Sequence, residues 1–318
     1  MEKLQNAIKS FLSHCQFEKN LSHKTLKAYD TDLSQFQTFL IKNGYPTLIT
    51  EISKVEIRDF ISSISDLKPK SIKRKIASIK SLFNYLEFED ILLLNPLRKM
   101  RIRIKEPRRL PTVLAFSEIK NIYTAAYQLK NKATNVNSYS YLEAIRNIVV
   151  IELLFNTGAR VSEIANLKAE NIDLKNGNIK IRGKGGKERM MQICSKDALT
   201  IIRSYSILYK VEIQLEGYFL INRHGKKLSD QSIRNLVKKL ASLAGISNRT
   251  TPHTFRHSFA TLLLEQDVDI KYIQCMLGHS SIVTTQIYTH VNSEKQRQIL
   301  KTKHPRRDMQ NASLLDAG

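Results

Sequence analysis

The core of the second half of this 318-residue chain is expected to form around LEAIRNIVVIELLFNTGAR, residues 142–160. Apolar residues recur on most sides of a helix from Leu142 to Phe155, which predicts a helix buried at the centre of a domain. The helix should stop at Asn156-Thr157-Gly158, and a new helix should begin around Arg160. Because arginine is electrostatically unfavourable at a helix start, the position favours a functional role for Arg160 over a surface ion pair.

The β signal lies just beyond this stretch, in residues 171–193. Apolar residues alternate around the turn Asn176-Gly177, and Gly183-Lys184-Gly185-Gly186-Lys187 forms a second tight turn, which predicts a small antiparallel sheet. Glycines on both sides of Lys184 permit close approach to a ligand, so this lysine is placed to reach a leaving oxygen. Taken alone, however, Lys184 is better explained as an ordinary hairpin lysine.

The last third of the chain concentrates the reactive side chains. His253, Arg256 and His257 share one face of a helix that begins at Pro252, because they are spaced i, i+3 and i+4. Phenylalanine and leucine residues fall toward the other side and should pack against the core. Each of these histidines alone is better explained as a structural residue, and the functional interpretation depends on the whole set.

Two further groups complete this set. His279 follows directly after the expected end of a helix over residues 270–277, and Tyr288 lies on the helix after that. One phenol, several imidazoles and arginines, without an acidic cluster that could hold a metal, suit phosphoryl transfer through a covalent tyrosine. We therefore expect no metal and no other cofactor, and a metal-dependent nuclease or transposase lacks its grouped carboxylates.

The first 97 residues read as four helices, one of them capped by Ser22 and followed by the helix end Asn43-Gly44. The fourth helix has basic residues on and before its opening turns, where the helix dipole favours carboxylates. DNA phosphate is the expected compensation, with Lys70, Lys73 and Arg74 as contacts. A solvated, lysine-rich face is the alternative.

A basic, proline-containing connector follows over residues 98–111 and includes Arg108 and Arg109, two further candidate DNA contacts. The expected division is therefore a helical DNA-binding domain at 1–97, the connector, a larger domain at 112–292 and a C-terminal tail at 293–318. An apolar stripe in the tail, Gln296, Ile299 and Leu300, predicts a helix that docks on a neighbouring subunit or folds back on its own domain. Residues 305–318 are expected to be disordered.

Positive charge dominates the composition, with 51 Lys and Arg against 29 Asp and Glu, a net charge of +22. This excess indicates a polyanionic partner, nucleic acid before a membrane surface. No stretch reaches the ~18 to 20 apolar residues of a transmembrane helix and the start lacks a signal peptide, so we expect a cytoplasmic protein without a membrane partner. Cys15, Cys194 and Cys275 are too scattered to encode a disulfide framework or a zinc site.

Taken in order, five motifs resemble those of tyrosine site-specific recombinases, most of all the Xer-type and phage-integrase branch. They are Gly158-Ala-Arg160-Val-Ser-Glu163, Gly183-Lys184-Gly185, His253-Thr-Phe-Arg256-His257, Leu277-Gly-His279 and Tyr288-Thr-His290. The resemblance spans roughly residues 4–290. It implies a mainly α fold with a small antiparallel β-sheet, in which a helical SAM-like core-binding domain and a tyrosine-recombinase catalytic domain form a clamp around DNA.

The resemblance also implies the reaction and its residues. The catalytic set would be Arg160, Lys184, His253, Arg256, His279 and the nucleophile Tyr288. Tyr288 would form a covalent 3′-phosphotyrosine with His253 as base and Lys184 as general acid, without metal or ATP. Exchange through a Holliday junction requires four active sites, which implies a homo- or hetero-tetramer on a double-stranded DNA recombination site.

Other functions remain open at the level of sequence. A type IB topoisomerase uses similar chemistry, and a DNA-binding protein without catalysis would share the charge, although the complete residue set argues against it. A ribosomal or RNA-binding protein would explain the charge but not the motifs. The sequence does not distinguish resolution of chromosome dimers from integration or excision of a mobile element.

Overall fold

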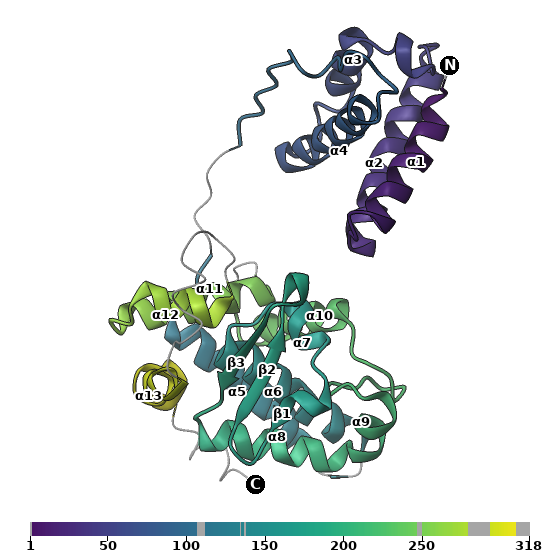
Figure 1. The fold of residues 1–318 in the computed structure, drawn as a ribbon. Coiled ribbons are helices and arrows are strands. Elements are labelled where there is room, and N and C mark those ends of the chain that lie inside the picture. The colour runs from purple at the N-terminus through teal and green to yellow at the C-terminus, as the bar shows by residue number, and fades with distance from the viewer. Residues whose placement is uncertain are drawn as a thin grey trace. The chain divides into compact units, whose positions relative to one another are not determined.

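The computed structural model describes residues 2–106, 112–133, 135–136, 138–246, 250–278 and 293–309, with the backbone alone at 184 and 293–295. The chain forms two compact units, Met1–Arg109 and Leu110–Gly318 (Figure 1). Most of the described residues are helical, and the strands form a single small antiparallel sheet. The predicted fold class, mainly α with a small antiparallel sheet, is confirmed.

The first unit is helical, as its sequence periodicity predicts. Ser22 caps its second helix, because the Ser22 hydroxyl accepts a hydrogen bond from the Thr25 backbone N–H. Ser53 and Glu56 form a capping box on the third. Its helices are α1 (Leu4–Phe17), α2 (His23–Lys42), η1 (Ile49–Glu51), α3 (Lys54–Ser63) and α4 (Pro69–Phe88).

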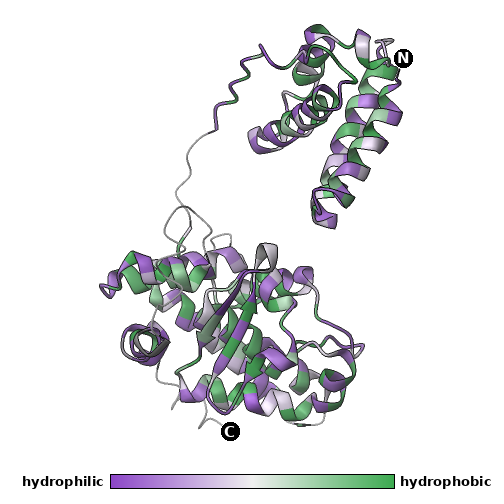
Figure 2. Ribbon diagram, in the orientation of Figure 1, coloured by the Kyte–Doolittle hydropathy of each residue, from purple (hydrophilic) through white to green (hydrophobic). Residues whose placement is uncertain are grey.

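The second unit is built around α6 (Tyr139–Thr157), in which every residue from Ala144 to Thr157 is buried. It packs against α5 (Phe116–Lys132), α8 (Lys196–Leu208) and α11 (Pro252–Glu265), which explains why its apolar residues cover all sides. Most other helices are amphipathic, as the mixture of hydrophilic and hydrophobic residues along each ribbon shows (Figure 2). The remaining helices are α7 (Val161–Ala165), η2 (Ala169–Asn171), η3 (Lys184–Gly186), α9 (Lys210–Glu216), α10 (Asp230–Leu243), α12 (Ile270–Leu277), α13 (Ser293–Lys303) and η4 (Pro305–Asp308).

The sheet has the order β1-β2-β3 and is antiparallel throughout. Its strands are β1 (Ile172–Asp173), β2 (Asn178–Arg182) and β3 (Glu188–Gln192). Ile179 pairs with Met191 and both are buried, whereas Ile181 pairs with Arg189. The predicted hairpin over residues 171–193 is therefore present, and its two turns lie where the glycines indicated.

One boundary differs from the sequence prediction. The polar stretch from Gln128 was expected to be a loop, but α5 continues to Lys132 because Leu129 still packs against the core while its polar neighbours face solvent. Helix α9, which the sequence reading did not propose, fills part of the connection between α8 and α10.

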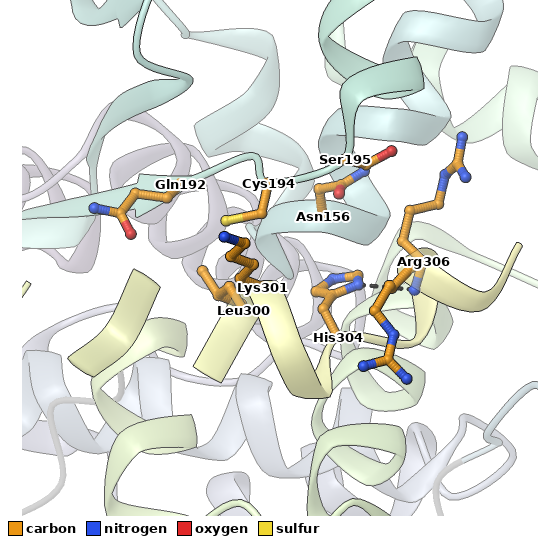
Figure 3. Close-up of a pocket in the computed structure, with 9 residues that line it drawn as sticks. Asn156, Gln192, Cys194, Ser195, Leu300, Lys301, His304 and Arg306 are labelled. Carbon is orange, nitrogen blue, oxygen red and sulfur yellow. Dashed lines mark hydrogen bonds between the residues drawn. The ribbon is translucent and has the colours of Figure 1, made fainter. Parts of the chain in front are cut away.

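The C-terminal segment lies on its own unit in this structure. Gln296 of α13 donates to the carbonyl oxygen of Met190 at 3.2 Å, and Leu300 is buried. A cavity of about 50 Å³ is lined on one side by Leu300, Lys301, His304 and Arg306 and on the other by Asn156 and by Gln192 at the end of β3 (Figure 3). Of the two arrangements expected for the tail, the described residues adopt the one that folds back.

The expectation of disorder from residue 305 onward is wrong for Pro305–Met309. Arg306 is 1% exposed and forms two hydrogen bonds with the Glu152 carboxylate of α6, at 2.7 and 3.1 Å. Glu152 also accepts from the Tyr123 hydroxyl at 3.0 Å and the Asn156 amide at 2.8 Å, so the buried charge is fully paired. Residues 310–318 lie outside the described residues.

His304 strengthens this attachment as a neutral imidazole. Its Nδ1 accepts from the Arg306 backbone N–H at 2.9 Å, which leaves Nε2 to donate to the Phe155 carbonyl oxygen at 3.3 Å. Burial lowers the pKa of His304 to about 4, so the ring stays uncharged at neutral pH.

Replacing Arg306 with methionine is expected to destabilise the second unit by about 3 to 5 kcal/mol, because it leaves the Glu152 carboxylate buried without its cation. Urea unfolding followed by circular dichroism, together with tryptic cleavage at Lys301 and Lys303, measures the effect. Arg307→Met is the matched control, since Arg307 is 57% exposed and pairs with exposed Asp308. Equal midpoints for the two variants would contradict the assigned role of the buried pair.

Candidate active site

Arg160 is positioned by the sharp end of α6. Gly158 has φ +56°, and a Cβ at this position would lie 2.6 Å from the Phe259 ring, so glycine is required for the turn. Arg160 is the N-cap of α7, and its backbone N–H donates to Glu163 Oε2 at 2.9 Å. The Arg160 guanidinium donates to the other oxygen of the same carboxylate at 2.7 Å. Glu163 therefore fixes both the backbone and the side chain of Arg160.

Arg256 reaches the same place from α11. Pro252 occupies the first turn of this helix, as predicted, and Thr251 caps it. The Arg256 guanidinium is buried and donates to two backbone carbonyl oxygens, that of Gly158 at 2.8 Å and that of Leu277 at 2.7 Å. Burial, followed by the charge of Arg160, lowers the pKa of Arg256 to about 10, which still leaves it protonated at neutral pH.

Three arginine side chains donate hydrogen bonds to consecutive carbonyl oxygens at the end of α12. Arg189 Nε donates to Met276 at 2.7 Å, Arg256 Nη2 to Leu277 at 2.7 Å, and Arg160 Nη2 to Gly278 at a longer 3.5 Å. The C-terminal end of a helix carries partial negative charge, which favours cations here. Gly278 ends α12 in the left-handed conformation, as the sequence predicted.

The site has more positive than negative charge. Arg189 Nη2 also donates to Glu163 Oε2 at 2.7 Å, so two guanidinium groups bind this carboxylate, and the charge of a third, that of Arg256, interacts with it. Burial alone would raise the pKa of Glu163, but the hydrogen bond and charge of Arg189, with the bonds from Arg160, hold this pKa below its usual value. Glu163 is thus ionised, and the surplus of cations favours binding of an anion.

His253 lies on the exposed side of α11. Partial burial lowers the pKa of His253, and the positive charges of His257 and Arg256 lower it further. The imidazole is therefore neutral at pH 7 and able to accept a proton. His253, Arg256 and His257 were expected on one face, but both histidines are exposed while Arg256 turns inward to its carbonyl partners.

Several candidate residues cannot be placed in the site. The backbone of Lys184 lies in η3, at the turn between β2 and β3, but its side chain lies outside the described residues. His279 and Tyr288 also lie outside them, as do Arg108 and Arg109 of the connector. Of the six catalytic candidates, the structure brings together Arg160 and Arg256, with the charge of both acting on His253.

The candidate DNA contacts on α4 are partly neutralised within the first unit. Fully buried Asp32 accepts hydrogen bonds from Arg74 at 2.6 Å and Lys75 at 3.0 Å. Lys73 pairs with Glu106 at 3.0 Å, and Lys70 is exposed. Part of the compensation that was expected from an external anion is therefore supplied by Asp32 and Glu106, and DNA contact by these residues stays a prediction.

Sequence reasoning assigned no role to Glu163 or Arg189. Glu163 lies within the motif that contains Arg160. Its position three residues after Arg160 is that of a capping-box acid, which was a sequence signal for its role. Arg189 shares a face of β3 with buried Met191, because residues two apart lie on the same side of a strand. A charged residue at a core-facing position of a strand is therefore the sequence signal that could have identified Arg189.

The described residues contain no group of three His, Cys, Asp or Glu side chains that could hold a metal ion. In the same part of the chain, no helix is both long and apolar enough to cross a membrane.

Comparison with known families agrees with this geometry. Residues 113–295 match the phage integrase family, and residues 8–90 match the N-terminal SAM-like domain of phage integrases. This chain belongs to the phage integrase family. A tyrosine recombinase of Agathobacter rectalis is 44% identical over 309 residues, which cover 97% of this chain and 99% of that protein. Tyrosine recombinase XerC of Thermodesulfovibrio yellowstonii is 35% identical, with 96% and 98% covered.

Solved structures show the same phage integrase fold. XerH recombinase in a post-cleavage complex with a palindromic difH substrate has a TM-score of 0.67 at 23% identity, covering 92% of this chain and 83% of that one. A lambda integrase dimer bound to a COC′ core site has a TM-score of 0.63 at 20% identity, with 88% and 96% covered. The resemblance to Xer-type tyrosine recombinases that the motifs indicated is confirmed over nearly the whole chain.

Proposed function

We propose that this chain is a site-specific DNA recombinase that cuts and rejoins strands through a covalent 3′-phosphotyrosine on Tyr288. The observation that carries the proposal is the pair Arg160 and Arg256, held on adjacent carbonyl oxygens at the end of α12, directly before His279. Their surplus positive charge suits a phosphodiester that gains negative charge in the transition state.

The two arginines retain donors for a phosphate. A guanidinium has five N–H groups, and Arg256 uses one on each terminal nitrogen for Gly158 and Leu277. The remaining N–H groups of Arg256 and Arg160 are available to the non-bridging oxygens of the scissile phosphate. Because Glu163 fixes Arg160, and the Gly158 and Leu277 carbonyl oxygens fix Arg256, before DNA binds, little reorganisation is needed.

The remaining steps follow from acid–base chemistry. The Tyr288 oxygen attacks phosphorus and passes its proton to neutral His253, while the bond from phosphorus to the 5′ oxygen breaks and Lys184 protonates that oxygen. His279 donates a further hydrogen bond to the phosphate. The phosphotyrosine keeps the energy of the broken phosphodiester bond. The 5′ hydroxyl released from a partner strand can therefore attack the phosphotyrosine and join the strands without ATP.

Strand exchange between two duplexes needs four such sites, so we propose a homo- or hetero-tetramer on double-stranded DNA with a Holliday junction as intermediate. Lambda integrase has been solved as a tetramer bound to a Holliday junction. We assign core-site binding to residues 1–97, with Lys70, Lys73 and Arg74, and to the connector at 98–111, with Arg108 and Arg109. Residues 112–292 carry catalysis, 293–318 form the tail, and the protein acts in the cytoplasm or nucleoid.

A plasmid assay separates this function from its alternatives. Genomic fragments that the protein binds supply the target site, and two directly repeated copies are cloned into a supercoiled plasmid. We expect two recombinant circles, with or without EDTA, because no step uses a divalent ion. Relaxation without exchange would instead indicate a topoisomerase, and retarded DNA without covalent adduct would indicate a binding protein.

A further inference from the structure

Arg189 of β3 makes contacts that the proposed reaction has not used. Its side chain is 11% exposed and connects Glu163 of α7 with the Met276 carbonyl oxygen of α12, both at 2.7 Å. We infer that Arg189 is a positioning residue for DNA cleavage: it orients Arg160 and Arg256 without contacting the phosphate. This inference rests on the proposed function.

The first route runs through Glu163. This carboxylate is 4% exposed, and its Oε2 atom accepts from Arg189 Nη2 and from the Arg160 backbone N–H, while Oε1 accepts from Arg160 Nη1. Arg189 therefore holds one carboxylate oxygen while the Arg160 guanidinium binds the other. Without it, Glu163 can rotate, and Arg160 loses its fixed direction.

The second route runs through the last turn of α12. Met276, Leu277 and Gly278 present consecutive carbonyl oxygens to Arg189, Arg256 and Arg160. Because these carbonyls belong to one rigid turn, the bond at Met276 also fixes the acceptor of Arg256. A Cβ at Gly278 would lie 3.1 Å from Arg189 Nη1, so the turn and the arginine are packed closely.

The third connection is to the hairpin that carries Lys184. Arg189 pairs with Ile181 across β2 and β3, at the base of the turn over residues 183–187. At Gly183, a Cβ would lie 3.4 Å from Glu163 Oε1 and 3.9 Å from Arg189 Nη1. Arg189 thus belongs to the hairpin that carries Lys184 and connects it with α7, through Glu163, and with the end of α12.

The test compares Arg189→Met and Arg189→Lys with Arg182→Met. Arg182 lies on the same hairpin and loses the same charge, but it is 55% exposed and pairs with Glu188 at the surface. Single-turnover adduct formation is measured on a nicked target site that traps the covalent complex, alongside site affinity. We expect Arg189→Met to cleave about 100-fold more slowly, because small displacements of catalytic groups have effects of this size. Arg182→Met should stay within about threefold of the parent.

A second substrate distinguishes positioning from simple support of the fold. A methylphosphonate at the scissile position replaces one charged oxygen by a neutral methyl group, which reduces the charge that the arginines must stabilise. If Arg189 acts through Arg160 and Arg256, the rate deficit of Arg189→Met should shrink to about tenfold or less on this substrate. Arg189→Lys, which keeps a single cationic donor group, should cleave the ordinary phosphate at a rate between those of Arg189→Met and the parent.

A deficit of equal size on both substrates, or a parental rate on the phosphate, would overturn the positioning role. Should Arg189→Met fail to fold by circular dichroism, the same comparison is made with Arg189→Lys, and the same two results would overturn the role. Absence of an adduct with the parent protein would overturn the proposed function instead, so the two failures are distinguishable.

Discussion

Tyr288→Phe is expected to bind the target site with parental affinity and to form no covalent adduct. The substitution removes the one oxygen that attacks phosphorus and keeps the ring, so binding contacts should persist. Enzymes that lose their nucleophile fall by roughly 10⁶-fold in rate, which places residual cleavage below detection. Labelled, nicked target DNA on a denaturing gel reads out the adduct, and a mobility-shift assay reads out binding.

The matched control for this experiment is Tyr272→Phe. Tyr272 is a half-buried tyrosine of α12, close in sequence to the proposed nucleophile but assigned no chemistry. This variant should give the parental yield of adduct. An adduct that persists in Tyr288→Phe would place the nucleophile elsewhere, and mass spectrometry of the DNA-linked peptide would identify it.

Arg256→Lys is expected to slow cleavage by about 10² to 10³-fold, the usual effect of losing one preorganised donor to a developing charge. Lysine keeps the positive charge, but a single ammonium cannot hold the Gly158 and Leu277 carbonyl oxygens while presenting two N–H groups to phosphate. Single-turnover cleavage at saturating protein isolates this loss from any change in binding.

Arg203→Lys is the control for the general effect of such a replacement. Arg203 also donates twice to a backbone carbonyl oxygen, that of Leu174, but it is exposed and belongs to α8. The Arg203→Lys variant should cleave the target DNA at the parental rate. A full rate in Arg256→Lys would mean that charge alone matters at this position and that the fixed fork of donors does not.

Local patterns in the sequence were sufficient for much of the fold. The apolar run of α6 predicted a buried helix, and the Asn176-Gly177 pair and the glycines around Lys184 predicted the turns of the sheet, because both depend on residues close in sequence. The motifs also predicted that Arg160 and Arg256 belong to one site. These predictions depended on side-chain types and spacings that can be recognised in the sequence itself.

The contacts that orient the site had no such signature. Arg256 binds backbone carbonyl oxygens of Gly158 and Leu277, and a carbonyl is present at every position whatever its side chain. The order of residues 305–309 depends on Arg306 meeting Glu152, 154 positions away, so a polar local composition predicted disorder wrongly. The position of Arg189 on the core-facing side of β3 was a signal, but its two partners are remote in sequence and could not be predicted from it.

The three arginines at the end of α12 bind main-chain oxygens, and this has a consequence for how the chain can diverge. The side chains of Met276 and Leu277 take no part in these bonds, so other apolar residues can replace them and leave the arginines in register. A one-residue insertion or deletion within α12 would rotate every carbonyl by about 100° and misalign all three partners. Descendants of this sequence should therefore conserve the length of α12 more strictly than its composition.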